Sequence, residues 1–167
     1  MAQRRTRRTV LSVLAVGLVA ALAVGLYLFQ PWRLFTTTTV DEAPISAVGG
    51  APLKVIATGE FLSHEHDTSG SVQLQRTPEG TLVLRITDLR TSDGPALRVW
   101  LTDQPVIRDD WHNFDDGTHV DLGALEGNEG NQNYELPAGT DLSTIKSVSI
   151  WCARFHVSFG AATLIPA

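Results

Sequence analysis

The chain begins with a hydrophobic segment that has no polar face. Residues 10–29 contain no charged residue, and Ser12 is the one polar side chain that interrupts them. At about 1.5 Å per residue, a helix of this length covers about 30 Å, the thickness of the hydrocarbon core of a bilayer. A helix that is apolar on every side does not suit the surface of a soluble domain. We therefore predict a transmembrane helix over residues 10–29.

The residues on either side of this segment predict its orientation. Residues 1–9 form a basic lead with four arginines, which favours the cytoplasmic side. At the other end of the span lie Tyr27, Phe29 and Trp32, whose aromatic rings suit the headgroup layer. The alternative is a cleaved signal peptide, but such apolar runs are usually 7–15 residues long and end in small residues. We expect a single-pass plasma-membrane protein with a cytoplasmic N-terminus and an extracytoplasmic C-terminal domain.

Residues 30–52 are predicted to be a linker. Four threonines are followed by Asp, Glu, Pro, Ser and Gly with little periodicity, a composition typical of flexible connections. Such a linker would hold the following domain a few nanometres from the membrane.

From Leu53 onward, apolar and polar residues alternate with the period of a β-strand. Residues 72–75 and 82–86 both alternate, and residues 77–80 (Thr-Pro-Glu-Gly) between them have the chemistry of a hairpin turn. Turn residues recur every 8–15 positions, which favours a mostly β fold. We predict an antiparallel β-sandwich or barrel-like domain over residues 53–165, preceded by one transmembrane helix.

The last apolar run, residues 147–159, has a conflict of register. Val148, Ile150 and Cys152 fall on one face, whereas Phe155, Val157 and Phe159 fall on the other, yet both sets look buried. One extra residue after Cys152, as in a β-bulge, would place both sets on one face. The alternative is a strand that is buried on both faces.

The charge distribution excludes one class of partner. Residues 1–33 carry five arginines and no acid, so the rest of the chain holds eight basic and eighteen acidic residues, a net charge of −10. A domain this acidic repels phosphate backbones, and we expect no binding to nucleic acid.

The chain has one cysteine, Cys152, and therefore no internal disulfide. A lone cysteine in a strand is often a small buried hydrophobic residue. The functional interpretation is a redox thiol, with Arg154 and His156 as modulators, because a nearby cation favours the reactive thiolate. Trp151 would shield the sulfur or help to carry an electron.

Other candidate sites follow from polar residues. His64 and His66 have a spacing that can chelate copper or zinc on one side of a strand, but a polar loop is the preferred interpretation and we expect no metal site. The acidic stretch 109–117 lacks the spacing of a calcium loop and is expected to be an exposed turn.

The segment 126–134 is rich in glycine and side-chain amides, which in a loop can bind sugars or ions. We therefore treat His66 and five residues of this segment as candidate binding residues: Asn128, Asn131, Gln132, Asn133 and Tyr134. We see no nucleophile elbow, phosphate loop or cofactor fingerprint in the sequence, and so expect no hydrolase or transferase activity.

The chain resembles the DM-thirteen domain family over about residues 53–165. The most specific stretches are residues 94–101, residues 130–137 (Gly-Asn-Gln-Asn-Tyr-Glu-Leu-Pro) and residues 150–152 (Ile-Trp-Cys). The family is a small β domain, often found beside haem-binding DOMON domains and described as an electron-transfer module.

The resemblance implies an electron-transfer role through Cys152 and no cofactor in the chain itself. Any haem would come from a separate partner, so a cytochrome or a thiol-redox protein is the expected partner. The family usually has aspartate where this chain has Ala96, and His66 matches a family histidine. The alternative function is a non-enzymatic module at the cell envelope that binds a carbohydrate, an ion or a protein.

Overall fold

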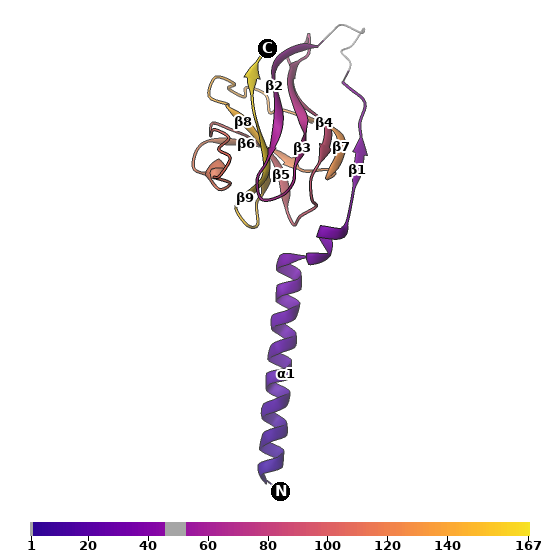
Figure 1. Ribbon diagram of the computed structural model, residues 1–167, viewed down its shortest axis with the longest axis vertical. Coiled ribbons are helices and arrows are strands. Elements are labelled where there is room, and N and C mark those ends of the chain that lie inside the picture. The colour runs from indigo at the N-terminus through magenta and orange to yellow at the C-terminus, as the bar shows by residue number, and fades with distance from the viewer. Residues whose placement is uncertain (1, 46–52) are drawn as a thin grey trace. The chain divides into compact units, whose positions relative to one another are not determined.

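The structure is a computed structural model that describes residues 2–45 and 53–167. The chain divides into two compact units, the first ending at Trp32 and the second beginning at Arg33. The first unit contains helix α1 (Ala2–Phe29), as Figure 1 shows. Its stretch Val10–Phe29 is long and apolar enough to cross a membrane. The predicted helix is therefore confirmed, and its properties fit either a membrane anchor or a signal sequence.

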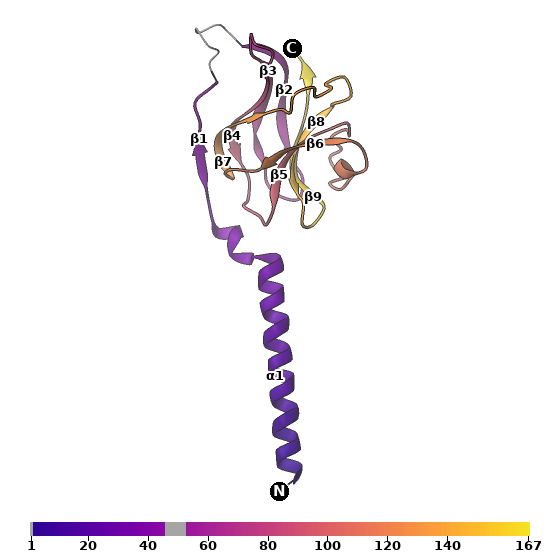
Figure 2. The same ribbon diagram turned by 180° about the vertical axis from the view of Figure 1, so that it is seen from behind.

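The second unit is a single ten-stranded sheet that curls into a half-barrel (Figures 1 and 2). The strand order is β1-β7-β4-β3-β2-β9-β8-β5-β6, with β10 paired to β2. All pairs are antiparallel except β1 with β7. The mostly β prediction is confirmed. The strands are β1 (Thr39–Asp41), β2 (Lys54–Ser63), β3 (Ser69–Arg76), β4 (Leu82–Arg90), β5 (Leu97–Thr102), β6 (His119–Ala124), β7 (Glu129–Glu135), β8 (Ser147–Cys152), β9 (Val157–Thr163) and β10 (Ile165–Pro166).

The inner face of the curled sheet holds the main hydrophobic core. Alternation along the strands directs every second side chain into it. The predicted hairpin is present as β3 and β4. Of the large residues that the alternation predicts to be buried, Phe61 is only half-buried, whereas the others are buried: Leu84, Val99, Leu101, Ile150, Trp151, Val157 and Phe159.

The outer face of strands β5, β8 and β9 is covered as well. The long connection from β5 to β6, residues 103–118, contains a short 3-10 helix (Asn113–Asp115) and inserts Phe114 into a second cluster with Trp100 and Trp151. All residues of β8 are therefore buried, on both faces. The acidic stretch in this connection is exposed at most positions, but Asn113 and Phe114 within it are buried.

The conflict of register in residues 147–159 has a different explanation from a bulge after Cys152. The chain reverses direction there, so that β8 and β9 form a hairpin in which Cys152 pairs with Val157. The amides of Phe155 and His156 donate to the Cys152 carbonyl, and His156 has a left-handed φ of 53°. The prediction of one long strand is therefore wrong in both of its forms: β8 is buried on both faces, but Phe155 lies in the turn and is exposed.

The predicted linker is also partly wrong. Residues 39–41 form β1, which pairs with the edge of β7 in parallel (Figure 2), and a 3-10 helix, η1 (Pro31–Phe35), precedes it. A strand of three residues has too little periodicity to be recognised in a sequence. The last part of the predicted linker, residues 46–52, lies outside the described residues.

Candidate functional site

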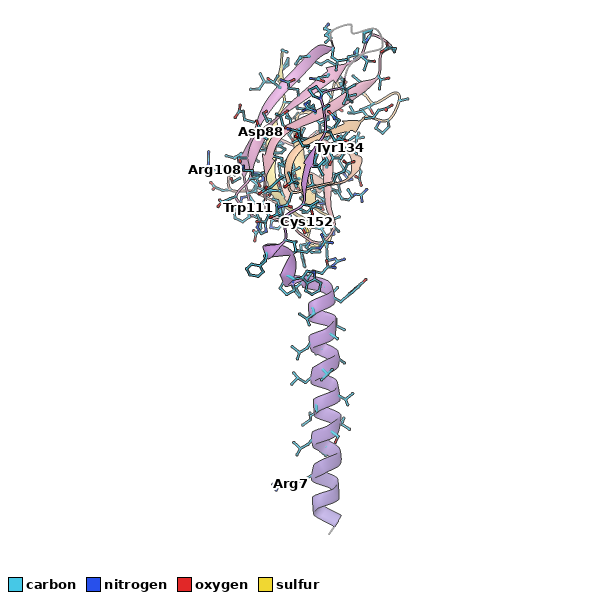
Figure 3. All side chains as sticks on the ribbon, turned by 90° about the vertical axis from the view of Figure 1, so that its right-hand side faces the viewer. Arg7, Asp88, Arg108, Trp111, Tyr134 and Cys152 are labelled. Atoms are coloured by element: carbon cyan, nitrogen blue, oxygen red, sulfur yellow. The ribbon has the colours of Figure 1, made fainter. Side chains whose placement is uncertain are left out.

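The thiol of Cys152 lies at the end of β8, inside the domain (Figure 3). Its side chain is completely buried on the inner face of the sheet, next to the strand partners Leu97 and Val157. The Sγ atom donates a hydrogen bond to the Pro95 carbonyl oxygen at 3.3 Å. The candidate redox thiol is therefore enclosed by the domain, and it contacts the turn that precedes β5.

This turn, residues 94–97, has two unusual backbone features. A Cβ atom on Gly94 would lie 2.7 Å from the Phe159 ring, so the close approach of the turn to the core requires glycine. Ala96 is exposed and has a φ of 66°, the left-handed region that alanine rarely adopts. Aspartate tolerates this region better, so the family's aspartate has a backbone reason to occur at Ala96, besides any role in a site.

The predicted modulators of the thiol lie largely on the other face of β8. Trp151 is completely buried in the outer cluster, and the edge of its ring meets His156 at a centroid distance of 6.3 Å. His156 is exposed and its Nδ1 lies 2.7 Å from Oδ2 of Asp115. Arg154 is half-exposed in the turn between β8 and β9. Proximity in sequence therefore does not bring Trp151 or His156 onto the side of the thiol.

The outer face instead carries a column of stacked rings. Trp151 stacks on Trp100 with centroids 5.0 Å apart, and Trp100 stacks on the exposed His119 at 3.8 Å. The column runs from the strand that carries Cys152 to the surface of the domain. Sequence reasoning missed it because its members come from three strands: β8, β5 and β6.

A cavity of about 270 Å³ lies beside the turn that covers the thiol. Gly94, Ala96 and Leu97 line one side of it, and Asn128 and Thr38 belong to the other. Cys152 does not line this cavity. Because the sulfur is completely buried, this conformation leaves it no exposed face for a haem.

The two histidines of the predicted chelating pair lie on opposite faces of the sheet. His64 is buried on the outer side, where its Nδ1 lies 3.0 Å from Oγ of Ser158, and His66 stacks on the inner residue Phe159 at 3.9 Å. Burial lowers the pKa of both imidazoles below the ordinary value. Among residues 2–45 and 53–167, three or more metal-ligating side chains do not gather anywhere.

The amide-rich segment is a strand, not a loop, because residues 129–135 form β7. Several of its amides bind the chain segment that contains β1. Asn131 donates from Nδ2 to Oδ1 of Asp41 at 2.6 Å, and Asn133 donates from its backbone and its side chain to Oε2 of Glu42. Asn128 accepts from the backbone amide of Thr38 at 2.7 Å.

Gln132 and Tyr134 instead form a buried polar group. Oε1 of Gln132 accepts from the Tyr134 hydroxyl at 2.7 Å and from the amides of Glu126 and Gly127, while its Nε2 donates to the Gly127 carbonyl. Burial raises the pKa of the Tyr134 hydroxyl well above its ordinary value. All five candidate binding residues of this segment thus make contacts within the chain, and their role in ligand binding stays a prediction.

A further set of contacts was not predicted. Arg33 pairs with Asp93 at 3.1 Å, and the Thr36 hydroxyl donates to the same carboxylate at 2.7 Å. These contacts hold the segment before β1 against the residues that precede the Gly94 turn. The signal in the sequence is weak, because an arginine and an aspartate sixty residues apart have no pattern in common.

Fold and site together define a curled β domain with one enclosed thiol at the end of a central strand. The family model described as "Electron transfer DM13" matches residues 60–164, and the chain belongs to this family. A search of curated proteins found no match, and neither did a search of solved structures.

Proposed function

We propose that this chain is a membrane-anchored electron-transfer domain outside the cell membrane, with Cys152 as its redox group. The observation that carries the proposal is that the family of electron-transfer domains covers the β domain and includes its one cysteine. The proposal requires the turn at residues 94–97, whose Pro95 carbonyl binds the thiol, to open so that the sulfur can meet a partner. Loops are the parts of a protein that open locally at the lowest free energy.

A thiol-redox protein is the partner that the chemistry favours. The Cys152 thiolate attacks one sulfur of a partner disulfide, the partner's S–S bond breaks, and its second sulfur leaves as a thiolate. A dithiol of a second protein then attacks the Cys152 sulfur, releases the first partner in its reduced form, and closes its own disulfide. Two electrons pass from the dithiol to the disulfide, and Cys152 returns to the thiolate.

A haem-bearing partner is the second candidate, and the column Trp151–Trp100–His119 favours it. Stacked rings give a continuous contact from β8 to the surface, whereas the thiol itself is enclosed. In this route one electron passes from the Cys152 thiolate through the rings to a ferric haem, which becomes ferrous and leaves a thiyl radical on Cys152. Reduction of ferricytochrome c by the full chain is a direct test. Replacement of Trp100 by leucine should slow this reaction several-fold if the column is the route, and leave it unchanged if it is not.

The thiol mechanism is tested with the full chain in nanodiscs and a small aromatic disulfide as the probe. We expect one equivalent of mixed disulfide on Cys152 under native conditions, reversal by a dithiol, and no reaction in Cys152→Ser. The matched control is Val148→Cys in the Cys152→Ser background, because Val148 is equally buried on the same face of β8 but distant from the turn. Equal rates for Cys152 and the control would refute a functional thiol.

The anchor is tested separately from the redox chemistry. Full-length chain with a C-terminal tag should remain in the membrane after alkaline extraction, because the span Val10–Phe29 is not removed. A protease added outside intact cells should cleave the β domain. Recovery of a soluble chain that starts after residue 30 would show that the helix is a signal sequence.

A further inference from the structure

The segment between the span and the β domain is bound to the domain along nearly its whole length. We call residues 33–42 the strap. It begins with the Arg33–Asp93 ion pair, continues through the hydrogen bond of the Thr38 amide to Asn128, and pairs as β1 with β7. It ends where Asn133 and Arg85 bind Glu42.

Two glycines show that the domain is shaped to accept the strap. A Cβ atom on Gly127 would lie 2.6 Å from the Thr38 carbonyl oxygen, and one on Gly130 would collide with the Val40 carbonyl. Gly130 also has a φ of 103°, which disfavours any other residue. The edge of β7 therefore has room for β1 only because side chains are absent at these two positions.

Docking of the strap leaves very little free chain. Only residues 30–32 separate Phe29, the last residue of the span, from Arg33, which is bound to Asp93. An extended chain covers at most about 3.6 Å per residue, so the connection from Phe29 to Arg33 has a reach of at most about 14 Å. The exposed Leu34 and Phe35 follow directly and suit a lipid headgroup layer.

We propose that the strap holds one end of the sheet, the end with the Gly94 turn over Cys152, at the surface of the lipid bilayer. This inference rests on the proposed membrane anchor. The short covalent connection keeps the domain there. A partner that reaches Cys152 through the turn therefore acts at the membrane surface, as a membrane-bound redox protein does.

The two ends of the sheet provide an internal comparison. Ala124 is exposed and lines the cavity beside the Gly94 turn, whereas Glu79 is exposed in the β3–β4 hairpin, at the opposite end of β4. Nine residues of β4 separate these ends, which at about 3.3 Å per residue is about 30 Å. A nitroxide on lipid headgroups should quench a fluorophore at position 124 several-fold more strongly than one at position 79.

The experiment uses full-length chain in nanodiscs, with single cysteines introduced as Ala124→Cys or Glu79→Cys in the Cys152→Ser background. Insertion of twelve Gly/Ser residues between Gln30 and Pro31 leaves the strap intact but lengthens the connection, and should abolish the difference. Gly130→Ala should reduce quenching at position 124 by displacing β1. Gly80→Ala is its control, because Gly80 has a similar φ of 97° but no atom within 4 Å of an added Cβ.

Each outcome decides between the proposals. Equal quenching at both positions in a chain that retains its span would overturn the strap inference and leave the anchor intact. An unchanged difference after the insertion would overturn it as well, because the domain would then bind lipid by itself. Loss of the span by cleavage would overturn both the anchor and the strap inference, while the reactivity of Cys152 would still report on the redox proposal.

Discussion

The Cys152 thiol and the Pro95 carbonyl oxygen lie 3.3 Å apart, in a hydrogen bond between the end of β8 and the turn before β5. All side chains of β8 are buried, and Cys152 is the last of them, in contact with this turn. The proposed function requires the turn to open locally, without separation of the sheet.

A first prediction concerns how denaturant affects labelling of Cys152. If the turn opens locally, the rate of labelling with a thiol reagent should depend only weakly on urea. Global unfolding of a small domain has a slope of about 1–3 kcal/mol per M urea, because much surface becomes exposed. The Val148→Cys control should follow that larger slope. A slope for Cys152 as large as the global one, measured by circular dichroism on the same protein, would mean that the thiol is a core residue.

A second prediction concerns Ala96. Its φ of 66° is unfavourable for alanine, and glycine adopts this conformation at little cost. Ala96→Gly should therefore raise the free energy of unfolding by about 0.5–1 kcal/mol, with a smaller gain for Ala96→Asn. The control Ala124→Gly, in strand β6 without a positive φ, should lower it by a similar amount. Destabilisation by Ala96→Gly in urea unfolding would show that the turn is not strained.

The sequence predicted those elements whose signals are local. Alternation and a turn with proline and glycine predicted the β3–β4 hairpin. The β8–β9 hairpin was missed because its turn, residues 153–156, contains neither glycine nor proline, and His156 takes the left-handed position. Without a turn signal, two strands that are buried on both faces look like one.

The candidate site residues stay a prediction, and their surroundings could not be read from the sequence. The family motif pointed to Cys152, and this position is consistent with the match over residues 60–164. The environment of the thiol depends on contacts that are distant in sequence, such as that with Pro95. The amides of β7 looked like ligand groups because their partners, such as Asp41 and Glu42, lie ninety residues earlier in a segment without a pattern.

A third prediction concerns the buried pair Gln132 and Tyr134. Tyr134→Phe removes one donor to Gln132 and should cost about 0.5–1.5 kcal/mol of the free energy of unfolding. Gln132→Leu should cost more, because the buried amide of Gly127 and its carbonyl also lose their partner. Urea unfolding of the two variants measures both effects. A larger loss for Tyr134→Phe than for Gln132→Leu would contradict the central role of the glutamine.

The last prediction concerns pH and the buried His64. Burial lowers its pKa in the folded protein, although the Ile107 backbone and the charge of Asp110 act in the opposite direction. The unfolded chain, with an ordinary histidine pKa of about 6.5, binds more protons between the two pKa values. The stabilisation is therefore fully present above about pH 6.5 and is lost as the pH falls from there through the folded pKa.

His64→Gln removes this titration and should make the free energy of unfolding less dependent on pH between about 7 and 5. The same replacement at His66, whose pKa is also lowered by burial, removes a second share of the dependence. Urea unfolding at a series of pH values measures the slopes, and carboxylates, which titrate in wild type and variants alike, cancel in the comparison. If His64→Gln and wild type had the same slope over this range, the imidazole would bind protons equally in the folded and unfolded chain, and its burial beside Ser158 would have to be reconsidered.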